Sequence, residues 1–123
     1  MSRIDGFQIF QIMDIQLIIT NVPNRDVASQ LASRLVESQL AACVNILAPC
    51  SSVYMWRNSL QTAEEILLLI KALKENYRAI EKEIQSLHPY ELPEIIAVPI
   101  ADGLPQYLNW IAAVSSRETP LPT

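Results

Sequence analysis

Residues 65–71, Glu-Ile-Leu-Leu-Leu-Ile-Lys, form an apolar run that is closed by a charge at each end. The run is too short for a membrane span, and it lacks the regular polar positions of an amphipathic helix or a half-exposed strand. It therefore predicts a central β-strand that is covered on both faces. Any fold of this chain has to bury both sides of this segment.

Three further segments are short and rich in β-branched residues, which predicts strands. The middle segment is interrupted at Pro49, so we expect one long strand that is bent or bulged there. Pro99 lies inside the last segment and indicates an edge strand or a bulge. The segments are residues 15–20, residues 41–47 continued by 53–56, and residues 94–100.

Helical periodicity appears between these strands. Val27, Leu31 and Leu35 recur every four residues after a break at 21–24, which predicts an amphipathic helix of about four turns that Asn24 or a neighbour can cap. A second helix is expected over residues 74–87, where Pro89 stops it. A short last helix is expected over residues 104–114, with Leu108, Ile111 and Ala112 facing inward.

The resulting order of strand, helix, strand, strand, helix, strand is typical of the ferredoxin-like α+β sandwich, a four-stranded antiparallel sheet with two helices on one face. The short C-terminal helix adds to this arrangement. The central hairpin, residues 41–71, is longer than usual strands and should project beyond the domain, exposing residues 53–56. Exposed apolar strand predicts pairing with another copy of the chain.

Length and composition fit one globular domain. The chain has 123 residues, of which 50% are hydrophobic and 18% charged. We expect an N-terminal extension over 1–12, the domain over 13–115 and a disordered tail over 116–123. The net charge of −4, without a basic cluster, argues against nucleic-acid binding.

Several features predict a cytoplasmic protein without a membrane anchor. No apolar run reaches the length of a membrane span, and residues 1–14 lack the apolar core of a signal peptide. Cys43 and Cys50 form no disulfide framework at this length, so free thiols in a reduced compartment are the simpler interpretation.

Five segments can be taken together as one ordered series: residues 40–45, residues 52–56, Glu65 with residues 70–71, residues 88–94 and residues 107–110. In their order and spacing they resemble the CutA divalent-cation tolerance proteins. The resemblance implies a ferredoxin-like fold and a tight trimer formed by strand pairing between subunits. It also implies an architecture similar to PII signalling proteins and a link to divalent-metal tolerance and copper binding.

Two positions depart from the pattern of that family. Trp56 is usually followed by Glu-Gly, whereas this chain has Arg57 and Asn58. Asn tolerates the left-handed backbone nearly as well as Gly, so the turn can survive. Lys71 is usually followed by Thr, whereas this chain has Ala72, which places any site built with that hydroxyl in question.

The candidate metal ligands are His88, Cys43 and Glu65. His88 follows a helix, where it could simply hydrogen-bond a carbonyl, or it could bind copper or zinc through a neutral imidazole. One histidine does not make a closed site, so it needs help from Cys43, from a nearby glutamate or from a second subunit. Cys43 could equally be an inert thiol in a strand, although the family resemblance favours a ligand.

A cleft between subunits is predicted from the remaining candidates. Glu65 and Lys71 are separated by an even number of residues and should share one face of their strand, where Lys71 could bind an anion and Glu65 a cation. Tyr54 and Trp56 likewise share a face, and burial at an interface explains them. Tyr90 and Glu94 complete the predicted lining of the cleft.

The family resemblance and the candidate ligands together imply a homotrimer that binds divalent cations, Cu(II) before Zn(II), and requires no cofactor. No Ser-His-Asp series, phosphate loop or HExxH motif is present, so no enzymatic activity is expected. One alternative is a PII-like signalling trimer that binds a small anionic metabolite at its clefts. Another is a non-catalytic trimeric scaffold.

Overall fold

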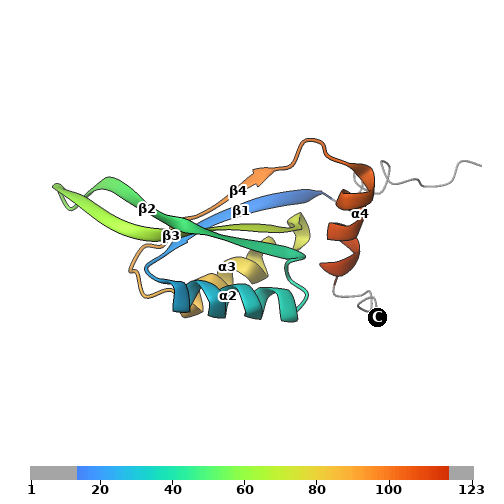
Figure 1. The fold of residues 1–123 in the computed structure, drawn as a ribbon, viewed down its shortest axis with the longest axis horizontal. Coiled ribbons are helices and arrows are strands. Elements are labelled where there is room, and N and C mark those ends of the chain that lie inside the picture. The colour runs from blue at the N-terminus through green and yellow to red at the C-terminus, as the bar shows by residue number, and fades with distance from the viewer. Residues whose placement is uncertain (1–13, 117–123) are drawn as a thin grey trace, which may run out of the picture.

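The computed structural model describes residues 14–116, which form one antiparallel sheet with three helices (Figure 1). The strand order is β2-β3-β1-β4, so β4, which contains Pro99, is an edge strand as expected. The ferredoxin-like order is confirmed. The elements are β1 Ile15–Val22, α2 Arg25–Glu37, β2 Cys43–Trp56, β3 Ser59–Leu73, a 3-10 turn Lys74–Asn76, α3 Tyr77–Leu87, β4 Ile95–Pro99 and α4 Pro105–Val114.

The predicted extension over 1–12 lies outside the described residues, and so does the predicted tail apart from Ser116. The second helix differs slightly from its prediction, because its first turn is a 3-10 turn and α3 begins only at Tyr77. Within residues 14–116, no helix has both the length and the apolar character that crossing a membrane requires.

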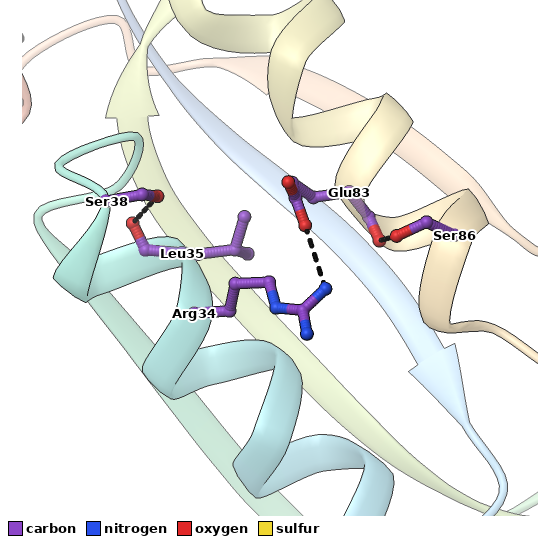
Figure 2. Close-up of polar contacts among 5 residues, drawn as sticks. All are labelled: Arg34, Leu35, Ser38, Glu83 and Ser86. Carbon is purple, nitrogen blue, oxygen red and sulfur yellow. Dashed lines mark hydrogen bonds and ion pairs between the residues drawn. The ribbon is translucent and has the colours of Figure 1, made fainter.

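Helices α2 and α3 lie side by side under one face of the sheet (Figures 1 and 2). Alternate residues of β3, from Ile66 to Ala72, point into this layer and pack with helix residues such as Leu31, Leu35, Ile80 and Ile84. Asn24 caps α2 as expected, its side chain accepting a hydrogen bond from the Val27 amide at 2.9 Å.

The surface of this helix layer carries one ion pair between the two helices. Arg34 of α2 reaches Glu83 of α3 at 3.5 Å, while Ser38 and Ser86 donate to backbone carbonyls of their own helices (Figure 2). Both charged side chains are partly exposed, so the pair contributes little compared with the apolar contacts beneath it.

The second face of the sheet carries the other alternate residues, among them Leu17 and Ile19 of β1 and Leu67 and Leu69 of β3. Helix α4 packs at one end of the sheet against Ile15 and Leu73, which belong to the same alternating set of residues on the second face. The middle of the face has no helix over it within residues 14–116 (Figure 1). One chain therefore covers β3 fully on the helix side and incompletely on the other side.

The long hairpin of β2 and β3 extends beyond the body of the sheet, as predicted (Figure 1). Its register shifts between Ile46 and Pro49, which is the expected bulge. Arg57 and Asn58 form the turn with φ values of 51° and 66°. Both residues sit in the left-handed region, where Asn is tolerated and Arg is strained.

Asn76 joins three parts of the chain where the 3-10 turn meets α4. Its side-chain amide donates to the carbonyl of Leu40 at 3.0 Å and to that of Ser115 at 2.6 Å. Asn76 is buried, so these two bonds satisfy carbonyls that water reaches poorly.

Candidate functional site

A cleft of about 600 Å³ lies where the projecting half of β2 passes the loop between α3 and β4. Its walls come from segments that are far apart in the sequence: β1, the hairpin, and residues 89–94. The lining residues are Asn21, Ser52, Val53, Tyr54, Trp56, Glu65, Pro89, Tyr90, Glu91, Leu92 and Glu94. Three of these are carboxylates and three are aromatic.

Glu65 is the buried acid of this cleft, with only 6% of its surface exposed. It begins the apolar run of β3 and points to the face opposite the helices. The Tyr90 hydroxyl donates a hydrogen bond to its carboxylate. Burial, this hydrogen bond and the negative charge of Glu65 raise the pKa of Tyr90 to about 12, so Tyr90 is a neutral donor at physiological pH.

His88 holds the cleft loop to β1 and is itself buried. Its Nε2 contacts the carbonyl oxygen of Asn21, and its Nδ1 accepts the Tyr90 amide hydrogen at 3.2 Å. These two contacts require the neutral ring with its hydrogen on Nε2. Both ring nitrogens are thus used by the backbone, and the ring also lies against Tyr90 with centroids 4.6 Å apart.

Two polar pairs lie beside this loop. The Asn21 side chain donates to Glu94 at 3.0 Å, and its own buried oxygen has no partner among residues 14–116. Arg57 at the hairpin turn pairs with Glu91 at 2.8 Å and lies 5.4 Å from the centre of the Trp56 ring. The Arg57–Glu91 pair is highly exposed and therefore weak.

Cys43 and Lys71 lie at the other end of the sheet, where they face each other across β2 and β3. The Lys71 ammonium group is 3.4 Å from the Tyr107 hydroxyl and 5.5 Å from the centre of its ring. Tyr107 in turn stacks on Trp110 of α4 at 5.6 Å. This end of the sheet carries a thiol, a cation and two aromatic rings.

The predicted site residues are therefore divided between two ends of one sheet face. Tyr54, Trp56, Tyr90 and Glu94 meet around Glu65 in the cleft, while Cys43 and Lys71 do not line it. Glu65 and Lys71 share a face as predicted, but six positions of β3 separate them, about 20 Å. Within residues 14–116, no three His, Cys, Asp or Glu side chains are grouped so that they could hold a metal ion.

Ala72 lies on the helix side of β3 and is fully buried in the core. Lys71 points to the opposite face. The alanine at this position therefore leaves the surroundings of Lys71 unchanged, because a hydroxyl at position 72 would face the helices.

No local sequence signal pointed to Asn21 or Ser52 as residues of the cleft, and none pointed to a role for Cys50. Cys50 faces Glu65 across the hairpin, a pairing that follows from the register after the bulge. The alternation of side chains along the strand after Pro49 could have predicted that Cys50, Ser52 and Tyr54 share one face. The register that brings this face to Glu65 has no signal in the local sequence.

Comparison with known proteins gives a consistent result over most of the chain. A family description reading "CutA1 divalent ion tolerance protein" matches residues 16–114. The chain is 40% identical over 96 residues to a divalent-cation tolerance protein CutA of Thermus thermophilus, covering 78% of this chain and 93% of the relative. It is 38% identical over 104 residues to Protein CutA of mouse, covering 81% of this chain and 59% of that longer protein.

Solved structures give the same match at the level of the fold. The CutA structure from Archaeoglobus fulgidus, described as a periplasmic divalent cation tolerance protein, superposes with a TM-score of 0.80 at 33% identity. The match covers 83% of this chain and 99% of that one. The Thermus thermophilus structure gives a TM-score of 0.78 at 39% identity, covering 80% of this chain and 95% of that one.

Proposed function

Because the chain belongs to the CutA family of divalent-ion tolerance proteins, we propose that it is a homotrimer that binds divalent cations, with Cu(II) preferred. The observation that carries the proposal is the incompletely covered second sheet face, where Leu17, Leu67 and Leu69 need an apolar partner. A further copy of the chain supplies one. Assembly also offers a way to bring the thiol end of one chain near the acidic end of another.

The proposed ligands are His88, Cys43 and Glu65, contributed by more than one subunit. Cys43 and Glu65 point to the face that is proposed to meet another copy. His88 differs, because a metal at Nδ1 has to displace the hydrogen bond from the Tyr90 amide. The proposal therefore makes His88 the ligand that depends on a rearrangement of the cleft loop.

The proposal includes no catalytic step. A cytoplasmic location fits the two free thiols, Cys43 and Cys50, although relatives include proteins described as chloroplastic and periplasmic. Copper suits the thiol and imidazole donors in the proposed set.

A second candidate is a PII-like trimer that binds a small anionic metabolite. Lys71 favours it, because its ammonium group lies beside Tyr107 on the exposed face. This candidate predicts stabilisation by carboxylates or nucleotides and indifference to Cu(II). A scaffold, the third candidate, predicts no stabilising ligand at all.

Calorimetric titration with Cu(II) tests the leading proposal. Removing a direct ligand should weaken binding by roughly tenfold or more, as even outer-shell changes do at metal sites. We expect this loss for Cys43→Ser and His88→Gln. Cys50→Ser is the matched control, because it removes the other free thiol, and it should bind as the parent protein does. Equal binding by all four proteins would exclude Cys43 and His88 as ligands.

A further inference from the structure

The charged residues that line the cleft around Glu65 are all acidic. Glu65, Glu91 and Glu94 line it, and no lysine, arginine or histidine belongs to the lining. Arg57 neutralises Glu91 at the rim, which leaves Glu65 and Glu94. Among residues 14–116, Glu94 accepts a hydrogen bond from the neutral amide of Asn21 and forms no ion pair.

Glu65 is a buried anion without an ion pair in the described part of the chain. A carboxylate removed from water loses much of its solvation, and a buried charge is normally paired for this reason. The Tyr90 hydroxyl supplies one neutral donor, which compensates only in part. The cleft thus holds an acid that a bound cation would stabilise.

The walls of the cleft indicate which kind of cation fits. Tyr54, Trp56 and Tyr90 present three aromatic rings, and ring faces attract organic cations. A volume of about 600 Å³ lies in the range of small-molecule sites and far exceeds that of a metal ion. The grouping of three acid, thiol or imidazole side chains that a metal needs is missing from residues 14–116.

We propose that this cleft binds a small organic ammonium ion, whose charged group pairs with Glu65 while its carbon chain lies against Tyr54, Trp56 and Tyr90. Glu94, on the exposed side of the cleft, offers an anion for a second ammonium group. An aliphatic diamine therefore matches the cleft better than a monoamine. This ligand goes beyond the proposed metal site and shares only Glu65 with it.

Tryptophan fluorescence gives a direct readout. Trp56 lines the cleft, and Trp110, the other tryptophan, lies at the far end of the sheet. The Trp110→Phe protein therefore reports on Trp56 alone. With a chelator present to remove metals, cadaverine should change this fluorescence in a saturable way. Pentanediol, its neutral counterpart, and glutarate, its anionic counterpart, should leave the fluorescence unchanged.

Glu65→Gln and Glu64→Gln form a matched pair of variants in this background, since they remove the same charge from adjacent residues. Glu64 is exposed and lies outside the cleft. Losing a charged hydrogen-bond partner should weaken cadaverine binding roughly tenfold or more in Glu65→Gln and leave Glu64→Gln unchanged. Glu94→Gln, an exposed change that is safe for folding, should weaken cadaverine several-fold and butylamine hardly at all.

Three outcomes would overturn the proposal. The first is unchanged fluorescence with cadaverine, as expected if another copy of the chain fills the cleft. The second is equal affinity of the Glu65→Gln and Glu64→Gln proteins. The third is an equal response to Mg²⁺ in the absence of chelator and cadaverine, because an ion without a carbon chain would then be enough. The chelator keeps this test independent of the copper titration, so either proposal can fail without the other.

Discussion

The two ends of the second sheet face have opposite chemistry although the same strands build them. The hairpin end gathers carboxylates and aromatic rings around the buried Glu65. The α4 end gathers Cys43, Lys71, Tyr107 and Trp110. Between them lies an apolar stretch that includes Leu67 and Leu69.

This difference means that residues 14–116 of one chain do not hold a complete soft-metal site. The thiol and the buried acid are about 20 Å apart along β3, and no loop movement on a rigid sheet closes that gap. A site that uses both needs two copies of the chain. The charged side chains of the two ends also differ in sign, with carboxylates at the hairpin end and Lys71 at the α4 end.

The largest expected effect comes from a charge placed between the two ends. Leu69→Asp puts a carboxylate in the stretch that is proposed to pack against other copies, and burying it there is strongly unfavourable. We expect the dissociation constant of the trimer to rise by roughly 100-fold or more, measured by sedimentation equilibrium. The affinity for copper should fall in parallel. Val36→Asp, an exposed change on α2, is the control and should leave assembly unchanged. An intact Leu69→Asp trimer would place the interface elsewhere.

The α4 end should respond to loss of the Asn76 side chain. Asn76→Ala leaves the buried carbonyls of Leu40 and Ser115 without their donors, so the free energy of unfolding should fall by about 2–4 kcal/mol. Urea denaturation at a fixed chain concentration measures this. Gln85→Ala on the exposed side of α3 should change it by less than about 0.5 kcal/mol. If the free energy of unfolding falls by less than one buried hydrogen bond contributes, water has replaced the amide of Asn76.

The hairpin end should show a smaller effect that appears only at alkaline pH. The pKa of Tyr90 is about 12 in the folded protein, above the ordinary value near 10. Because the unfolded chain loses this proton first, the contribution of Tyr90 to stability is complete below about pH 10. It is lost as the pH rises towards 12. Tyr90→Phe should flatten this decline in denaturation curves recorded across that range.

Phenolate absorbance provides an independent check of the same group. Tyr90→Phe should remove a titration near pH 12, whereas Tyr54→Phe should leave that step in place. A Tyr90 that ionises near the ordinary pKa of about 10 would mean that Glu65 does not hold its hydroxyl.

Most of the fold was predicted from local patterns, because prolines, helix caps and strand alternation act over only a few residues. Pro89 ends α3, Asn24 caps α2, and the alternation of β3 separates its two faces. Pro99 correctly indicated an edge strand. The 3-10 turn before α3 had no comparable signal, since Lys74 to Asn76 continue the helical pattern.

The candidate site was less predictable, because its residues meet only through pairings between distant segments. The sequence predicted that Tyr54, Trp56, Tyr90 and Glu94 line a cleft between subunits, and it carried no signal that they meet within one chain. It gave no means to see that Cys43 is far from Glu65 or that Cys50 is opposite it. His88 is a clear example, since its two backbone partners, on Asn21 and Tyr90, depend on where the loop docks.

The sequence by itself determined the order of strands and helices, the buried run of β3 and the family, because periodicity, capping and proline act over a few residues. The tertiary structure alone decided which acids, thiols and rings share a space. That depends on the register of the long hairpin, where the bulge before Pro49 fixes what faces Glu65. A shift of one residue in that register would turn Ser52 and Tyr54 away from the cleft and leave the strand order unchanged.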